Sequence, residues 1–347
     1  MVSFLFDPTK FSSDNTFMKK ILVSLLFLLT SIGVFAAEKT EAKYKLRTPE
    51  GTPAEFKESW GYVTMKRSEE YSKTIPLTDV CFFSAEINCY GELVSIPDRK
   101  KIDIGNARSH MVIVCDSYSL SHMVLNPDFG IRKKLIKDIV KAADPFDGVQ
   151  IDFEVVPARD RLNFHSFIEE LRNALPGEKW FTMCVPARVK LLQDDMYPYE
   201  KLSKLVDRIF VMCYDQHWSG STPGAIAEVE WSKKVAKYAQ SVIPEKKLIM
   251  GIPFYGRTWV NKTTAQAWYF SGANRIMREN GVSEVTYEND IPSFKYKTQV
   301  EVTGFFNDAY SDHKLCKAYE EMGIKKIGFW RIGQEDPDFW KWIKITK

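Results

Sequence analysis

The chain has 347 residues, and its 48 lysine and arginine residues nearly balance 45 aspartate and glutamate residues, giving a net charge of +3. This balance offers no electrostatic reason to expect nucleic acid or an anionic membrane surface as a partner. A hydrophobic content of 45% excludes a disordered or collagen-like chain. The aromatic content of 14% is the unusual feature of the composition.

Residues 1–36 are predicted to be an N-terminal extension followed by a signal peptide. Met18 and two lysines precede an apolar run at 21–35, and small residues lead to a cleavage site after Ala36. The run is short for a membrane span and is followed at once by charged residues. We therefore expect export through a signal peptide from Met18 to Ala36, to the periplasm, cell envelope or exterior. We expect no stable membrane insertion after cleavage; a retained membrane anchor is the alternative.

After a polar lead at 37–57, short apolar strands recur with helix-length segments between them. Apolar residues have helical spacing in Asp128–Ala143 and Asp160–Leu175, and the first residue of each segment is a suitable N-cap. This alternation over 58–347 predicts one α/β domain with the fold of a (β/α)8 TIM barrel. We expect no second domain, and we expect the protein to be a monomer. A segment at 260–305 departs from the rhythm and is predicted to be a small insertion between strand 7 and helix 7. The eight predicted strands begin near Gly61, Asp79, His110, Gly148, Trp180, Arg208, Lys247 and Lys326.

The fourth predicted strand carries an unusual polar face. Side chains alternate along a strand, so Gln150, Asp152 and Glu154 share the face opposite Val149 and Ile151. If the apolar face meets the helices, the polar face lies inside the barrel, where it is costly unless paired or hydrogen-bonded. The structural alternative is a buried row of polar side chains that hydrogen-bond only one another and bind no substrate. Because Glu154 stands at the end of the strand, where barrels bind substrate, we predict a functional site.

Aromatic residues stand near the ends of several other predicted strands. Pyranose rings present apolar C–H faces that stack on aromatic rings, and hydroxyl groups that polar side chains bind. Aromatic residues beside two carboxylates therefore predict a sugar site, although any single tryptophan, taken alone, is more often part of core packing. The candidates are Tyr62, Tyr214, Trp218, Tyr255, Trp259 and Trp330.

Four motifs in order resemble glycoside hydrolase family 18, the chitinase-like (β/α)8 enzymes. The fourth-strand signature D-G-x-D-x-D-x-E matches here from Asp147 to Glu154, with Gln150 as its one departure. The sixth-strand motif M-x-Y-D, the seventh-strand motif G-x-P-x-Y-G-R and the eighth-strand tryptophan also match. The stretches DVCFFSAEIN, FDGVQIDFE and DQHW are most similar to the bacterial branch of spore-germination and cortex-lytic hydrolases. The matching residues of the last three motifs are Met212, Tyr214 and Asp215; Gly251, Pro253, Tyr255, Gly256 and Arg257; and Trp330.

The resemblance implies a substrate-assisted, retaining hydrolysis of β-1,4 linkages in a GlcNAc-containing polysaccharide. Glu154 would be the general acid and then the base, which requires a raised pKa. Asp152 would orient the substrate's acetamido group, and Tyr214 would donate a hydrogen bond to it. The remaining implied substrate contacts are Asp215, Trp330, Met212, Tyr62, Arg257, Trp218 and Tyr255, with Asp147 and Gln150 in supporting positions.

Two departures from the family pattern bear on activity and substrate. Gln150 replaces a carboxylate, and we expect it to donate to Asp152 and to alter the pH profile without abolishing activity. The third strand, HMVIVCDS, lacks the S-x-G-G of chitinases, which favours peptidoglycan or another GlcNAc glycan over chitin. Chitin stays open as a substrate. A catalytically silent carbohydrate-binding barrel is the alternative from another functional class.

Other chemistries have no support in the sequence. It contains no CxxC pair, HExxH, G-x-G-x-x-G or P-loop, so we expect no metal, no nucleotide and no cofactor. Cys115, Cys184 and Cys213 lie in apolar strands and are expected to be free thiols. Pairing of Cys81 with Cys89 stays open.

Overall fold

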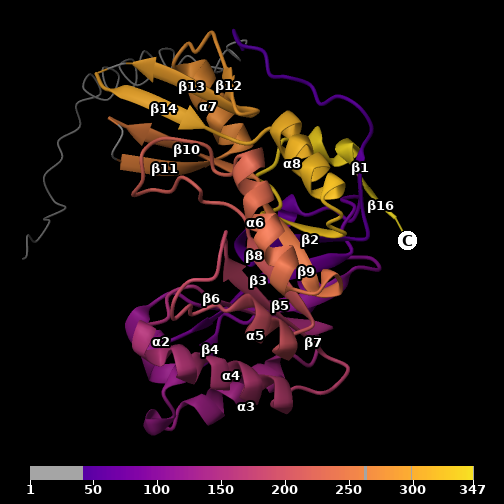
Figure 1. The fold of residues 1–347 in the computed structure, drawn as a ribbon, viewed down its shortest axis with the longest axis vertical. Coiled ribbons are helices and arrows are strands. Elements are labelled where there is room, and N and C mark those ends of the chain that lie inside the picture. Colours follow the sequence, from indigo (N-terminus) through magenta and orange to yellow (C-terminus); the bar gives the residue numbers. More distant parts are fainter. Residues whose placement is uncertain (1–41, 262–263, 298, 347) are drawn as a thin grey trace, which may run out of the picture. The chain divides into compact units, whose positions relative to one another are not determined.

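Eight parallel strands form a closed barrel (Figure 1). The computed structural model describes residues 42–347 except 262–263, 298 and 347, so the predicted extension and signal peptide lie outside the described residues. The strands follow chain order around the barrel, and the first pairs with both the second and the last, which confirms the predicted fold. They are β2 (Glu58–Thr64), β3 (Asp79–Ile87), β5 (Arg108–Cys115), β6 (Gly148–Phe153), β7 (Trp180–Pro186), β8 (Arg208–Met212), β9 (Leu248–Pro253) and β15 (Lys326–Trp330).

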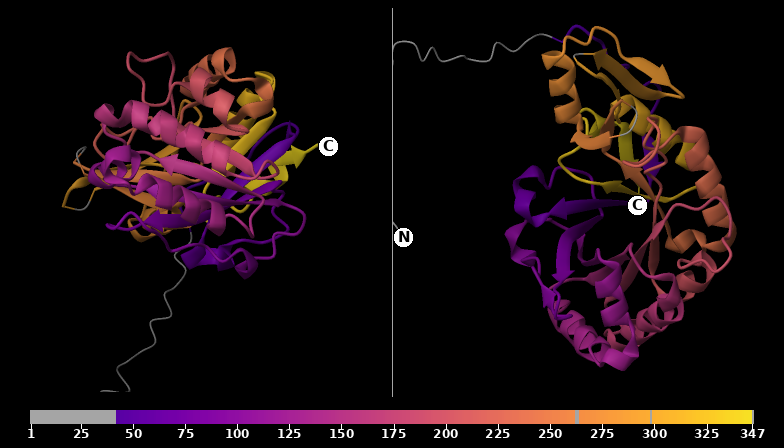
Figure 2. Two further views of the ribbon diagram at one scale, coloured as in Figure 1. Left: turned by 90° about the horizontal axis from the view of Figure 1, so that it is seen from below. Right: turned by 90° about the vertical axis from the view of Figure 1, so that its left-hand side faces the viewer.

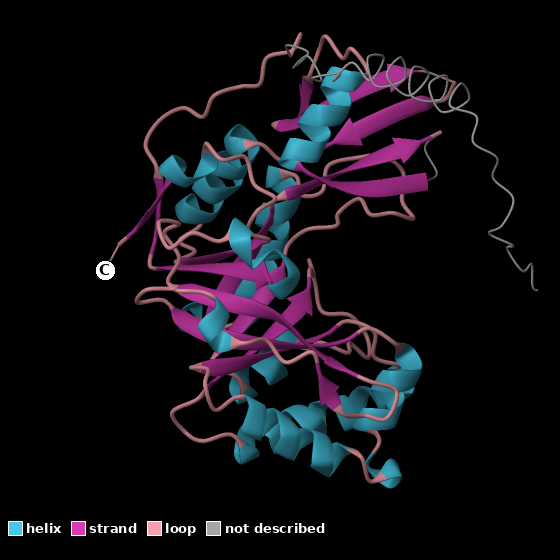
Figure 3. Ribbon diagram, turned by 180° about the vertical axis from the view of Figure 1, so that it is seen from behind, coloured by secondary structure: helices cyan, strands magenta, loops and turns pink. Residues whose placement is uncertain are grey.

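Helices cover the outside of the barrel from the third strand onward (Figure 3). The first two connections differ from the predicted rhythm: residues 65–78 and 88–107, all described, contain only 3-10 turns and the short strand β4 (Leu93–Val94). Near the chain ends, β1 (Ala54–Phe56) pairs in parallel with β16 (Ile343–Ile345). The helices around the barrel are α2 (Tyr118–Leu125), α3 (Arg132–Ala142), α4 (Arg161–Ala174), α5 (Tyr199–Leu205), α6 (Val229–Val242) and α8 (Ala309–Glu321).

Of the two predicted N-caps, Asp128 is wrong, whereas Asp160 holds the N-cap position without making a capping bond. Asp128 lies in a 3-10 turn, and α3 begins only at Arg132. Asp160 does precede α4, but its side chain makes no capping bond. It instead accepts hydrogen bonds from His122 and Asn163, so a tertiary contact replaces the local cap.

The insertion begins earlier than the sequence predicts. The segment Gly251–Trp259, expected as one barrel strand, divides after Pro253, and β10 (Tyr255–Val260) leaves the barrel for a separate antiparallel sheet. With α7 (Phe270–Glu279), this sheet gathers at the opposite end of the molecule from α3 and α4 (Figure 1). Its other strands are β11 (Thr264–Tyr269), β12 (Thr286–Glu288), β13 (Ile291–Lys297) and β14 (Glu301–Phe305).

Strand alternation divides the barrel into two apolar layers, as predicted for β6. Val149, Ile151 and Phe153 pack outward in the main core, where Phe153 stacks on Phe164 and Phe167 of α4. Helices lie along this outer face in the right-hand view of Figure 2. The interior has its own smaller cluster, formed by Trp60, Tyr62, Cys81, Val112, Cys184, Phe210 and Ile249.

An ion-pair network fills the amino-terminal end of the barrel. Asp79 is fully buried and accepts from Arg108 at 2.7 and 2.8 Å and from His110 at 2.8 Å. These bonds and the positive charge of Arg108 outweigh burial and lower the pKa of Asp79. The network closes the barrel at the end opposite the ends of the strands that carry the candidate site.

All six cysteines are free thiols in the structure, including Cys81 and Cys89. Among residues 42–347, as far as they are described, no helix is long and apolar enough to cross a membrane. The same part of the chain contains no group of three or more side chains suited to holding a metal ion.

Candidate active site

Two cavities meet at the carboxyl end of β6, and together we call them the cleft. Asp152 and Glu154 line both cavities, which places the two carboxyl groups at the junction. We call the first cavity, about 450 Å³, the Glu86 half, and the second, about 240 Å³, the Trp330 half. The Trp330 half is lined by Met212, Tyr214, Asp215, Tyr255, Arg257, Ala267, Trp268, Tyr269, Trp330 and Gln334 besides the two acids.

The environment of Asp152 and Glu154 keeps protons on the pair. Burial and, to a smaller extent, the charge of Glu154 raise the pKa of Asp152 to about 7, although hydrogen bonding from the Cys184 thiol opposes the rise. Burial also raises the pKa of Glu154, with the charge of Asp215 adding to the effect. Glu154 nevertheless keeps an exposed side chain at the barrel mouth, while only 7% of Asp152 is exposed. The pair can therefore hold a proton near neutral pH and deliver it to a molecule in the cleft.

Below Asp152, the expected hydrogen bond from Gln150 is not formed. The buried Gln150 Oε1 accepts from the Tyr62 hydroxyl at 2.5 Å, and that hydroxyl also lies 3.2 Å from Cys184 Sγ. Gln150 Nε2 and Asp152 Oδ1 are both buried without a partner among the described residues. Unpaired buried polar atoms are costly. The free oxygen of Asp152 is therefore a ready acceptor for a group bound in the cleft.

Asp215 is held in a fixed orientation at the end of β8. Its Oδ1 accepts from the Tyr255 hydroxyl at 2.7 Å and from Arg257 Nη2 at 2.9 Å. The backbone at Asp215 has a φ of 57°, in the left-handed region that is uncommon for residues other than glycine. Both partners belong to β10, so the start of the insertion, rather than the barrel alone, orients this carboxylate.

Trp330 forms the junction between barrel and insertion in the Trp330 half. Its ring packs edge-on against Phe83 at 4.7 Å and Tyr62 at 5.3 Å. The next residue, Arg331, donates to Tyr269 of β11 at 2.6 Å and to Glu70 at 2.6 Å. This connection holds β11 over the aromatic floor of the cleft.

Most of the predicted site residues lie together. Asp152, Glu154 and the two sixth-strand residues Met212 and Tyr214 share the Trp330 half with the predicted contacts Asp215, Tyr255, Arg257 and Trp330. Burial raises the pKa of Tyr214 well above its usual value, so its hydroxyl stays protonated and able to donate.

Four other predicted residues lie elsewhere. Tyr62 is buried beneath the cleft and lines neither cavity. Trp218 is 53% exposed and also lies outside both. Trp259 is fully buried and packs against Phe305 inside the insertion. Asp147 lies at the opposite end of β6, where it accepts from the backbone and hydroxyl of Ser109 at 2.7 Å.

Sequence reasoning missed the walls of the cleft that come from other elements. Trp268 and Tyr269 face it from the insertion, and no periodicity in their segment indicated that position. Phe83 and Glu86 lie in the carboxyl-terminal half of the second barrel strand, and Asp116 directly follows the third; their places at the ends of apolar runs were an available signal.

Raised carboxyl pKa values at the strand ends of a closed parallel barrel, with aromatic walls around them, define a barrel glycosidase. The chain belongs to family 18 of the glycosyl hydrolases, because the family model described as "Glycosyl hydrolases family 18" matches residues 91–335. This match confirms the resemblance inferred from the four motifs.

Several bacterial proteins are similar to the chain. It is 30% identical over 231 residues to YdhD of Bacillus subtilis and 28% identical over 288 residues to the cortical fragment-lytic enzyme of Bacillus anthracis. These alignments cover 62% and 76% of this chain, but only 54% and 67% of the relatives, so the chain spans little more than half of YdhD. The crystal structure of the Bacillus cereus spore cortex-lytic enzyme SleL matches with a TM-score of 0.73 at 25% identity, covering 87% of this chain and 77% of SleL.

Proposed function

We propose that the protein is an exported, retaining glycosidase that hydrolyses β-1,4 linkages of a GlcNAc-containing polysaccharide by substrate-assisted catalysis. One observation carries the proposal: Asp152 and Glu154 meet in the cleft with raised pKa values, and Asp152 keeps a buried oxygen without a partner. A proton donor beside a free acceptor matches what an acetamido nucleophile needs.

In the proposed first step, protonated Glu154 donates its proton to the glycosidic oxygen as the bond to C1 breaks. The acetamido oxygen of the same sugar attacks C1, which gives an oxazolinium ion. Asp152 accepts a hydrogen bond from the acetamide N–H and offsets the positive charge. Water then attacks C1, ionised Glu154 takes a proton from it, and net retention of configuration results.

Other residues of the Trp330 half hold the reacting sugar in this proposal. Tyr214, protonated over the working pH range, donates to the acetamido oxygen. Asp215 Oδ1 is already occupied by Tyr255 and Arg257, so its second oxygen is available for a sugar hydroxyl. Trp330 offers an aromatic face for the pyranose ring.

Peptidoglycan is the substrate we propose first, with chitin as the alternative. The cortex-lytic names of the relatives and the absent S-x-G-G motif support this order. The test is to digest purified peptidoglycan and colloidal chitin side by side, reduce the products with borohydride and identify the sugar at the new reducing end. Release from peptidoglycan with N-acetylglucosamine at that end supports the proposal, whereas release from chitin alone contradicts the peptidoglycan assignment.

A catalytically silent binding protein is the competing function, and Glu154→Gln separates the two. If Glu154 is the acid, the variant binds a GlcNAc oligomer like the wild type but hydrolyses it about 10²- to 10⁴-fold more slowly. Equal and negligible hydrolysis by both proteins, with binding retained, would exclude the enzyme.

Export remains part of the proposal and rests on the sequence of Met18–Ala36. N-terminal sequencing of the protein from a producing cell tests it. We expect a new terminus at Ala37 in the fraction outside the cytoplasm, and an intact terminus in the cytoplasm would contradict it.

A further inference from the structure

The Glu86 half of the cleft has a composition that the proposed reaction does not use. Glu86 and Asp116 line it together with the two acids of the reaction, and its lining includes no lysine, arginine or histidine. Neither Glu86 nor Asp116 forms an ion pair with any described residue, and Glu86 accepts only from the Ser95 hydroxyl at 3.4 Å. The chain as a whole carries a net charge of +3, so this concentration of acids is local.

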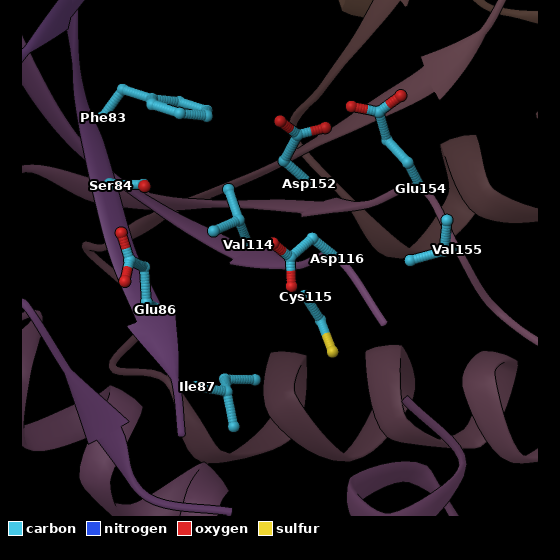
Figure 4. Close-up of a pocket in the computed structure, with 10 residues that line it drawn as sticks. All are labelled: Phe83, Ser84, Glu86, Ile87, Val114, Cys115, Asp116, Asp152, Glu154 and Val155. Atoms are coloured by element: carbon cyan, nitrogen blue, oxygen red, sulfur yellow. The ribbon is translucent and has the colours of Figure 1, made fainter. Parts of the chain in front are cut away.

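Strand register places these acids in line with the reacting centre. Glu86 pairs with Val114, and Val114 pairs in turn with Asp152 on the next strand. Adjacent strands lie about 4.8 Å apart, so the backbones of Glu86 and Asp152 are roughly 10 Å apart, about the length of a disaccharide. Asp116 follows Val114 by two residues, at the mouth of the same half. Figure 4 shows Glu86, Asp116 and Val114 around the cavity, with Asp152 and Glu154 side by side along its edge.

Two further features indicate that this half receives a ligand. Phe83 lines it and offers an apolar face, since its ring is only half-buried. Asp152, more than nine-tenths buried, also lines this half, and its oxygen without a partner is the one that receives the acetamide N–H in the proposed reaction, so the reacting sugar lies directly beside this half. A ring-shaped group with a positive charge would satisfy both the aromatic face and the unpaired acids.

We propose that the Glu86 half binds a primary ammonium group carried by the glycan, one or two sugar units from the cleaved bond. This inference rests on the proposed glycosidase function and specifies its substrate. The ammonium group has two possible sources: the amine of a de-N-acetylated glucosamine, or a free amine on the stem peptide of peptidoglycan. Either would pair with Glu86 and Asp116, whereas a fully acetylated neutral chain would leave them solvated.

The first test digests partially de-N-acetylated chitin and sequences the product ends by mass spectrometry. We expect wild type to enrich glucosamine at one position near the cut about threefold to tenfold over its random frequency, less at high salt. The double variant Glu86→Gln with Asp116→Asn should lose that enrichment. Glu169→Gln, an exposed acid on α4, is the matched control and should keep it.

The second arm identifies the source. Peptidoglycan with intact stem peptides is compared with the same material after an amidase removes them. Sensitivity to the double variant only when peptides are present assigns the ammonium group to the stem peptide. Two results together would overturn the inference. One is the same glucosamine frequency at the product ends for wild type and double variant in the chitin digest, and the other is the same response to the double variant with and without stem peptides.

Binding separates this inference from the proposed hydrolysis. Glu154→Gln protein is titrated with fully acetylated and singly de-N-acetylated oligomers of one length, followed by tryptophan fluorescence. Tighter binding of the charged oligomer that Glu86→Gln abolishes supports the inference even where hydrolysis is absent. Equal affinities would contradict it even where hydrolysis is present.

Discussion

The two halves of the cleft share Asp152 and Glu154 but are built differently. In the Trp330 half, Asp215 is held by hydrogen bonds from Tyr255 and Arg257. In the Glu86 half, Glu86 and Asp116 have no cationic partner among the described residues. A preorganised half suits chemistry, because its groups need not reorient during reaction. A half with unpaired charge suits selection among substrates.

The largest expected contrast is between replacing a carboxylate that takes part in the reaction and replacing one that lines only the Glu86 half. Asp152→Asn should lower kcat by about 10²- to 10³-fold on a fully acetylated GlcNAc oligomer, because it removes the charge that orients the acetamido group and stabilises the oxazolinium ion. Asp116→Asn should change kcat less than threefold on the same oligomer. Steady-state rates on a GlcNAc hexamer measure both, and similar losses would remove the distinction between the halves.

A smaller loss is expected when the support of Asp215 is weakened. Tyr255→Phe deletes one hydrogen bond to a charged group, for which about tenfold lower kcat/KM is expected, while Arg257 keeps its own bond. Tyr90→Phe, an exposed tyrosine outside both cavities, is the control and should be unchanged. An unaffected Tyr255→Phe would show that Asp215 does not need this preorganisation.

The pH-rate profile should fall as pH rises through the upper titration of the acid pair, near the Asp152 pKa of about 7, because the proton to be donated is then lost. Gln150→Asp adds a third carboxyl below Asp152, which should raise that pKa and move the fall to higher pH. The test is to measure the pH-rate profiles of wild type and Gln150→Asp on one substrate. Superimposable profiles would contradict the predicted shift to higher pH.

The last expected effect is on stability and not on rate. Asp152 titrates near 7 when folded and near 3.8 when unfolded, so the folded state holds the extra proton between these values. The contribution of Asp152 to stability therefore falls as pH rises from about 4 to 7, by about 1.4 kcal/mol per unit of pKa difference at most. Asp152→Asn should gain stability relative to wild type across that window in denaturant melts at several pH values. A constant difference would mean that the side chain is ionised when folded.

The sequence predicted the barrel, and the polar face of its fourth strand, from local patterns. Strict alternation in β6 identified Gln150 and Asp152 as interior residues, because a one-residue error would expose Val149 and Ile151. Side-chain partners were harder to predict. Gln150 accepts from Tyr62 and does not donate to Asp152, and Asp160 accepts from His122 in place of a backbone amide of its own helix, because tertiary partners competed with the nearest residues in sequence.

The sequence by itself determined where the eight barrel strands lie, which face of the fourth is polar, and that an acid stands at the end of the fourth. These follow from periodicity and from the cost of burying unpaired polar groups. Only the tertiary structure decided that the chain leaves the barrel after Pro253, that Trp268 and Tyr269 cover the cleft, and that Glu86 and Asp116 share a half with Asp152. The reason is that these positions depend on register and packing between segments distant in sequence, which no local pattern encodes.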